Sequence, residues 1–129
     1  MLISGITPQL RTCDLEESIR FYTEKVGLVL DFRHADFYAG IRAGDHVFHL
    51  KKVESRDPSI SFVQAGNHLH LYLSTKDVDA VAARLEASGV TLQRKPANTA
   101  WQTRELVFLD DQGHTIYVAQ SLGEAALPE

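Results

Sequence analysis

Long apolar runs are absent from this sequence of 129 residues. No stretch approaches the roughly 18 consecutive apolar residues of a membrane-spanning helix, and the N-terminus lacks a basic segment followed by an apolar one. Cysteine is almost absent too: Cys13 stands alone, which excludes an internal disulfide and fits a reducing compartment. We therefore expect a cytoplasmic protein without membrane contact, in which Cys13 has a structural role.

Clusters of basic residues are also missing. The chain has 13 Lys and Arg against 17 Asp and Glu, a formal net charge of -4, and its basic residues are scattered, which excludes nucleic-acid binding through a basic face. With 44% hydrophobic and 23% charged residues the composition is that of a globular protein, long enough for one domain but not for two ordinary ones. We expect one domain at residues 1–122 and a loose tail or docking segment at 123–129.

The clearest pattern that is present is the stretch CDLEESIRFYTEKVGL. Asp14 can cap a helix, while Glu17, three residues on, can reach back to the N–H of Asp14. Gly27 supplies a left-handed stop. The apolar residues between them recur at helical spacing: Leu15, Ile19, Tyr22 and Val26. The pattern predicts a helix at residues 15–26.

A second stretch, STKDVDAVAARLEASGV, repeats this pattern. Asp77 opens it and Gly89 ends it, 12 residues apart, where Asp14 and Gly27 are 13 apart. Its apolar stripe consists of Val78, Val81, Ala82 and Leu85. The two helices and their flanking alternating segments indicate an internal repeat of about 62 residues.

Each predicted helix follows one strand candidate, ITPQLRT or HLHLYLS, and precedes three more. These are LVLDFRH, FYAGIRA and HVFHLKK in the first half, and VTLQRK, TRELVFLD and TIYVAQ in the second, with PAN and DDQG as breaks. The sequence thus predicts an α+β fold of two tandem βαβββ modules, at about 1–52 and 67–121. Residues 53–66 are the expected linker, in which ISFV could add a short edge strand.

Strand alternation assigns the faces of these strands. Because half a domain cannot bury its own sheet, we expect the two modules to form one partly open mixed sheet, with helices outside and a concave inner surface. The expected core residues under the helices are Ile6, Leu10, Phe48, Leu50, Leu69, Leu71, Leu73, Ile116 and Val118. The expected inner residues are Thr7, Gln9, Arg11, Val47, His49, Lys51, His68, His70, Tyr72, Tyr117 and Ala119.

Three motifs on this repeat resemble the vicinal oxygen chelate (VOC) superfamily, which includes glyoxalase I, fosfomycin resistance proteins, extradiol dioxygenases and bleomycin resistance protein. They are the helix openings DLEESIRFYTEKVGL and DVDAVAARLEASGV and the closing run WQTRELVFLDDQGHTIYVAQ. That run is similar to the pattern Trp-x-x-Arg-Glu, Asp-Pro-Asp-Gly and a final Gln of the bleomycin-resistance-like branch. Its matching residues are Trp101, Arg104, Glu105, Asp110, Gly113 and Gln120, with Asp111 and Gln112 replacing the proline and the second aspartate. The resemblance covers residues 5 to 121.

Enzymes of this superfamily hold a divalent ion at four strand positions, which the resemblance places at Thr7, His49, His70 and Tyr117. Thr7 replaces the usual histidine or glutamine and Tyr117 the usual glutamate. A neutral hydroxyl is a poor ligand, and forming a phenolate at neutral pH costs roughly 4 kcal/mol. Two imidazoles alone fall short of a catalytic zinc site, and magnesium or manganese prefer oxygen ligands. We expect no cofactor; a divalent metal on His49 and His70 is the alternative.

The remaining histidines divide into two groups. His68 shares the predicted face of His70, so it either joins His49 and His70 in a displaced metal site or lines a polar cleft. His34, His46 and His114 fall in or beside predicted turns, where we expect them to be solvated.

Without a metal, the concave surface offers aromatic rings that stack on planar ligands or face cations, and polar groups that orient them. The expected ligand-binding residues are Thr7, Gln9, His49, His68, His70, Tyr72, Trp101, Glu105 and Tyr117. Trp101 either contacts ligand or shields the core, and the two tyrosines either line the cleft or belong to the core. Arg104 and Glu105 alternate, so one faces inward unless they form a cross-strand or intersubunit ion pair.

These residues lead to three hypotheses. The first is a metal-free small-molecule binding protein of sequestration or resistance type, which takes an aromatic or amphipathic ligand; the resemblance implies a homodimer whose clefts both chains complete. The second is a divalent-metal-dependent lyase, isomerase or thiol transferase of glyoxalase I or fosfomycin-resistance type. The third is metal-free acid-base catalysis by His70 with Glu105.

Overall fold

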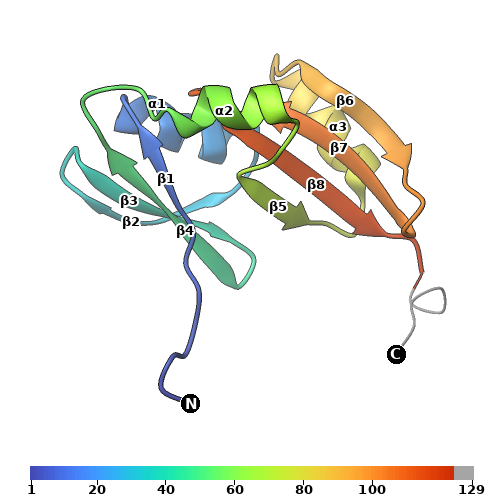
Figure 1. Ribbon diagram of the computed structural model, residues 1–129, viewed down its shortest axis with the longest axis horizontal. Helices are drawn as coiled ribbons and strands as arrows, with labels where there is room; N and C mark the ends of the chain where they lie inside the picture. The colour runs from blue at the N-terminus through green and yellow to red at the C-terminus, as the bar shows by residue number, and fades with distance from the viewer. Residues whose placement is uncertain (124–129) are drawn as a thin grey trace. The chain divides into compact units, whose positions relative to one another are not determined.

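The computed structural model describes residues 1–123. The chain divides into two compact units, with the boundary between Pro58 and Ser59, inside the predicted linker (Figure 1). Apart from Gly123, the expected tail at 123–129 lies outside the described residues.

The first unit is a four-stranded sheet with one helical segment. In chain order it has β1 (Gln9–Thr12), α1 (Leu15–Arg20), the π-helical turn η1 (Phe21–Lys25), β2 (Val29–His34), β3 (Tyr38–Ala43) and β4 (His46–Lys52). The strand order is β1-β4-β3-β2, with β1 parallel to β4 and the other pairs antiparallel. Four of the predicted elements are therefore present within one or two residues of their expected ends.

The second unit repeats this topology after an additional helix. It has α2 (Ser59–Gly66), β5 (Leu71–Ser74), α3 (Val78–Ala87), β6 (Leu92–Asn98), β7 (Thr103–Leu109) and β8 (Thr115–Ser121). The strand order β5-β8-β7-β6 again has one parallel pair at the first strand and antiparallel pairs elsewhere. The α+β class and the duplicated βαβββ module are confirmed.

Both repeated helices begin with the predicted aspartate cap. The backbone N–H of Glu17 donates to Oδ1 of Asp14, and that of Ala80 donates to Oδ1 of Asp77, each at 3.0 Å. Gly27 and Gly89 follow the helices with φ of 88° and 85°, which a glycine adopts without strain. One detail of the prediction is wrong: the N–H of Asp14 donates to Oγ1 of Thr12 at 3.0 Å, rather than to Glu17.

Each sheet packs one face under its own helix. In the first unit the stripe of α1 and η1 is buried against β3 and β4, and the rings of Tyr22 and Phe48 meet edge to face at 5.1 Å. In the second unit α3 lies behind the sheet in Figure 1 and contacts β6, β7 and β8. The buried residues there include Val78, Ala82, Leu85, Leu106, Phe108, Ile116 and Val118. Burying such a side chain contributes roughly 1.5–3 kcal/mol.

Two residues predicted to be core are exposed instead. Ile6 is 94% exposed because β1 begins only at Gln9, after Pro8, which has no N–H to donate to a strand partner. Leu69 is 39% exposed because the chain leaves α2 through Asn67, whose φ is 58°, and β5 begins only at Leu71. Thr7 and His68 therefore also precede their strands.

The linker prediction is wrong in part, because ISFV belongs to the helix α2 and not to an edge strand. Ile60 is buried and anchors this helix, whereas Phe62 is 71% exposed. The predicted break at PAN is also wrong: Pro96 lies inside β6, which is an edge strand with a register shift between Arg94 and Ala97. An edge strand with a bulge tolerates a proline, since no neighbour needs its N–H.

A bulge recurs at the same place in both units. In β2 the register shifts between Leu30 and Phe32, and in β6 it shifts between Leu92 and Arg94. Leu92 pairs with Phe108 on the helix-covered face, but Arg94 pairs with Val107, so the shift turns Arg94 to the open face. In the first unit Phe32 turns in the same way and its ring covers Gly40, where an added Cβ would lie 2.2 Å from Cε2 of Phe32.

Candidate functional site

The sheet of the second unit has a row of four side chains across its uncovered face. The strand register aligns Tyr72 with Tyr117, Tyr117 with Val107, and Val107 with Arg94. The rings of Tyr72 and Tyr117 stack, with centroids 6.3 Å apart and planes 29° from parallel. We call this row, together with Glu105 and Trp101 beside it, the tyrosine face.

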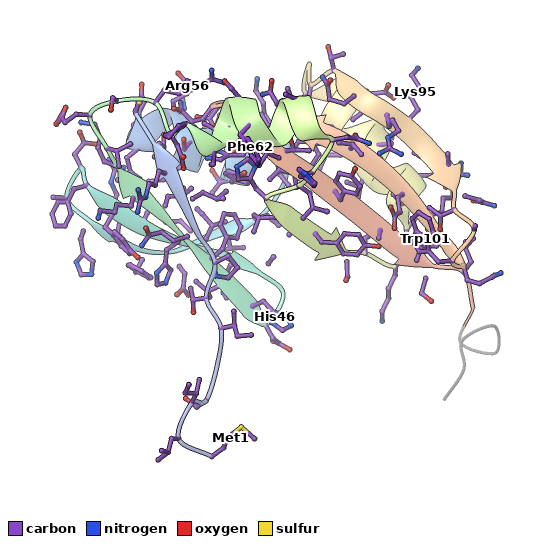
Figure 2. The ribbon with its side chains drawn as sticks, in the orientation of Figure 1. Met1, His46, Arg56, Phe62, Lys95 and Trp101 are labelled. Atoms are coloured by element: carbon purple, nitrogen blue, oxygen red, sulfur yellow. The ribbon has the colours of Figure 1, made fainter. Side chains whose placement is uncertain are left out.

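Glu105 is the most heavily hydrogen-bonded side chain of the tyrosine face. Its Oε2 accepts hydrogen bonds from the hydroxyl of Tyr72, from Nε1 of Trp101 at 3.2 Å and from Oγ1 of Thr103 at 2.8 Å. Trp101 reaches it from the turn between β6 and β7, where Figure 2 labels it. The carboxylate is thus held in place by three neutral donors.

These contacts set the protonation states of the tyrosine face. Burial raises the pKa of Glu105, but the hydrogen bonds from Tyr72, Thr103 and Trp101 and the charge of Arg94 outweigh it, so this pKa lies below its ordinary value. Burial, and then the hydrogen bond to Glu105, raise the pKa of the Tyr72 phenol. Glu105 is therefore an anion at neutral pH, and Tyr72 is a protonated donor.

Arg104 lies on the opposite face of β7. Its Nε and Nη2 donate to the two carboxylate oxygens of Asp79 on α3, at 3.1 and 3.0 Å, and the hydrogen bond lowers the pKa of Asp79. Of the pair Arg104 and Glu105, Glu105 is the residue on the open face, and the ion pair of Arg104 joins strand to helix within the chain.

Arg94 completes the other end of the row. Its Nη2 donates to the hydroxyl of Tyr117 at 2.9 Å, and its guanidinium carbon lies 5.6 Å from the ring centroid. These two side chains border a cavity of about 420 Å³ between the tyrosine face and the end of α2. The cavity is lined by Val63, Gln64, Asn67, His68, Gln93, Arg94, Val107, Leu109, Thr115 and Tyr117.

His68 and His70 occupy different environments. The ring of His68 stacks on exposed Phe62, labelled in Figure 2, with centroids 6.4 Å apart, and it lines the cavity. His70 is half-buried: its Nδ1 accepts from the N–H of Thr115 at 3.2 Å, and its Nε2 lies 3.1 Å from Oγ of Ser59. Both ring nitrogens of His70 are thus engaged with the protein.

The prediction that His114 is solvated is wrong. His114 is 1% exposed, and its Nδ1 lies 2.8 Å from Oδ2 of Asp110, whose Oδ1 also accepts from the N–H of His114 at 2.8 Å. The pair closes the turn between β7 and β8, and the ring of His114 meets that of His70 edge to face at 4.8 Å. His34 and His46 are exposed, as predicted.

The open face of the first sheet carries a polar chain of its own. Gln9 and His49 pair in register, and the hydroxyl of Tyr38 links them: it accepts from Nε2 of Gln9 at 3.1 Å and lies 2.8 Å from Nδ1 of His49. Phe32 packs its ring against His49 at 5.2 Å. Sequence analysis missed Tyr38, although its alternation with buried Ala39 and Ile41 would have placed it on this face.

At three of the four implied metal positions the residue does not fit a divalent ion. Thr7 is exposed and precedes β1, His70 has both nitrogens engaged, and Tyr117 accepts a hydrogen bond from a guanidinium cation. Within residues 1–123 no group of three or more His, Cys, Asp or Glu side chains is placed to hold a metal ion. The donor chemistry is that of a hydrogen-bonding surface.

His70 and Glu105 lie far apart along their sheet. The N–H of His70 donates to the carbonyl of Thr115, whereas Glu105 pairs with Ala119, four residues further along β8. At about 3.3 Å per residue this separates them by ~13 Å. The two side chains therefore do not meet at one proton.

The duplicated βαβββ module with an open sheet face defines a class of small proteins, and sequence comparison identifies the family. The profile of the glyoxalase/bleomycin resistance protein/dioxygenase superfamily matches residues 5–118, and the chain belongs to this superfamily. An uncharacterised protein of Mycolicibacterium smegmatis is 32% identical over 105 residues, which cover 81% of this chain and 83% of the relative.

Solved structures share this fold. TnmS3, an antibiotic-binding protein from Streptomyces sp. CB03234, is 27% identical, with a TM-score of 0.66 over 94% of this chain and 98% of its own. A bleomycin-binding protein solved in complex with bleomycin is 19% identical, with a TM-score of 0.73 over 92% of this chain and 99% of its own. Within the described residues, no helix is long and apolar enough to cross a membrane.

Proposed function

We propose that this protein binds a small aromatic or amphipathic organic molecule, without a metal ion, and that it does so as a homodimer. The observation that carries the proposal is the tyrosine face, where the ring of Tyr117 stacks on that of Tyr72 and borders a cavity of about 420 Å³. This volume lies within the range of roughly 300–1,000 Å³ that is typical of small-molecule sites. Binding and sequestration require nothing further from the chain.

Similarity supports the same class of function. The superfamily includes bleomycin resistance proteins, and two proteins of this fold bind an antibiotic, TnmS3 and the bleomycin-binding protein. Since one fold supports many activities, the argument for this chain rests on its own tyrosine face rather than on the fold. Gln9 and His49 on the open face of the first sheet, with Thr7 before it, are the other residues that we assign to ligand contact.

We propose that no metal ion is bound because of the state of the donor atoms at His70 and Tyr117. A metal ion that binds His70 must displace the N–H of Thr115 from Nδ1, or the proton that Nε2 donates to Oγ of Ser59, and either change leaves a polar group without its partner. Tyr117 offers a neutral hydroxyl beside the charge of Arg94, which repels a second cation. Tightly bound metal in the purified protein, together with metal-dependent turnover, would replace this proposal by the lyase, isomerase or transferase alternative.

The experiment is a melting-temperature screen of aromatic antibiotics and planar metabolites, followed by calorimetry on each compound that raises the midpoint. We expect Tyr72→Ala and Tyr117→Ala to weaken binding about tenfold or more, because each removes stacking area. Tyr117→Phe keeps the ring and should bind within a few-fold of wild type. Phe37→Ala, which removes an exposed ring of the first unit that we do not assign to the site, is the matched control.

The dimer has a separate test. Sedimentation equilibrium should give about twice the chain mass of 14.4 kDa. A mass equal to one chain at the concentrations used for binding would refute the dimer, and it would leave ligand binding by the single chain to be judged from calorimetry.

A further inference from the structure

Glu105 is a buried anion that makes no ion pair within the described residues, although the charge of Arg94 contributes to its lowered pKa. It is 9% exposed, and no Lys, Arg or His nitrogen of the described residues lies within 4.0 Å of its carboxylate. Removing a carboxylate from water is costly, and here the three hydrogen bonds that offset this cost all reach one of its two oxygens. Buried carboxylates are rarely left without a cation or a full set of hydrogen bonds.

The hydrogen bonds to Glu105 are unevenly distributed between its two oxygens. All three donors, Tyr72, Trp101 and Thr103, end at Oε2. Oε1 receives none from residues 1–123, yet it is not among the unpartnered atoms that are closed off from solvent. One carboxylate oxygen is thus fixed by the protein, and the other is oriented and reachable.

The surroundings of Oε1 suit an organic cation. A second, smaller cavity of about 70 Å³ is lined by Arg94, Lys95, Ala97, Asn98, Thr99, Glu105 and Val107, and a group the size of a water molecule needs only ~30 Å³. Nζ of Lys95 lies 3.8 Å from Oε2 of Glu86 on α3, and its side chain is 81% exposed. Trp101 is 63% exposed and Tyr72 is 48% exposed, so parts of two electron-rich side chains that donate to the carboxylate are accessible to a ligand. Such rings attract cations within about 6 Å of their centroids.

We propose that the ligand carries a protonated amine or an amidinium group, which binds Oε1 of Glu105 while its aromatic part stacks on the tyrosine face. This proposal rests on the proposed small-molecule binding function and adds the charge of the ligand to it. Arg94 is the resident competitor: it borders the same small cavity, and its one hydrogen bond to Tyr117 leaves the guanidinium free to turn toward Glu105.

The test uses two planar probes of similar size and opposite charge, 9-aminoacridinium and anthracene-9-carboxylate, at neutral pH. Trp101 is the only tryptophan of the chain and donates to Glu105, so quenching of its fluorescence reports on this site, with calorimetry as the second measurement. We expect wild type to bind the cation at least tenfold more tightly than the anion. Raising the salt concentration should weaken binding of the cation.

Two variants separate charge from shape. Glu105→Gln keeps the size and the acceptor for the three donors but removes the charge, and it should lower the affinity for 9-aminoacridinium about tenfold without lowering that for anthracene-9-carboxylate. Arg94→Gln should raise the affinity for the cation several-fold, because its competitor is gone. If Glu105→Gln fails to fold, Arg94→Gln and the salt dependence of wild type decide the question.

The outcomes are distinguishable. Equal affinity for both probes, or tighter binding of the anion that depends on Arg94, would overturn the cationic ligand and leave small-molecule binding intact. If neither probe quenches Trp101 and no compound of the aromatic panel shifts the melting temperature, both proposals fail together.

Discussion

The backbone N–H of Thr115 donates a hydrogen bond to Nδ1 of His70 at 3.2 Å. Nδ1 must hold a lone pair to accept it, so neutral His70 carries its proton on Nε2, which donates to Oγ of Ser59 at 3.1 Å. This tautomer offers no lone pair to a metal ion and cannot take the proton of Ser59. His70 therefore ties β5 to β8 and to the start of α2.

Weak metal binding is the first prediction. Calorimetric titration with zinc should show no site tighter than about millimolar, because a metal must displace Thr115 or Ser59 from His70. His70→Asn, whose side-chain oxygen can replace Nδ1 as the acceptor, should give the same weak isotherm as wild type. A micromolar zinc site that is lost in His70→Asn would contradict the metal-free assignment.

The second prediction concerns stability at the same residue. His70→Ala leaves the N–H of Thr115, a buried residue, without its acceptor, and it should lower the free energy of unfolding by about 1–3 kcal/mol. His70→Asn should recover at least half of that loss. Urea denaturation of the three proteins measures both differences, and equal stability of the two variants would show that packing alone, rather than the hydrogen bond, matters here.

Much of the fold could be predicted because each element of the repeated βαβββ module has a local signal. Both helices of the repeat have an aspartate cap and a glycine stop at similar spacing: Asp14 with Gly27, and Asp77 with Gly89. The pattern of one module therefore predicted the elements of the other. Alternation likewise placed Tyr72 and Tyr117 on one face and Ile116 and Val118 on the other, as the register and burial show.

The residues that prediction missed depend on non-local geometry. Alternation puts Leu92 and Arg94 on the same face, but the bulge between them turns Arg94 over Tyr117. His114 follows a turn sequence, yet its hydrogen bond to Asp110, four residues earlier, holds it in the core. Neither a bulge nor a buried hydrogen-bonded pair has a reliable pattern in a single sequence.

The Asp110 and His114 pair supplies the third prediction. Asp110→Ala removes the acceptor of both Nδ1 and the backbone N–H of buried His114, and it should destabilise the protein by roughly 3 kcal/mol. Asp45→Ala, at the exposed turn between β3 and β4, is the matched control and should change stability by less than about 0.5 kcal/mol. Thermal or urea unfolding measures both, and similar small losses would mean that the pair is not what holds the β7–β8 turn.

The last prediction concerns acid stability and tests the charge of Glu105 without any ligand. Burial raises its pKa, but the hydrogen bonds from Tyr72, Thr103 and Trp101 and the charge of Arg94 outweigh burial, so the pKa lies below the ordinary value of 4.5. The folded state therefore holds the proton less tightly than the unfolded chain, so the stabilisation is fully present above about pH 4.5 and is lost as the pH falls through the folded pKa. On acidification, the unfolding free energy of wild type should therefore fall relative to that of Glu105→Gln. Glu54→Gln, in the exposed loop after β4, controls for the loss of one carboxylate. The opposite result, in which the unfolding free energy of wild type rises relative to that of Glu105→Gln as the pH falls, would mean that burial outweighs the three hydrogen bonds. Glu105 would then be protonated too readily to recognise a cation.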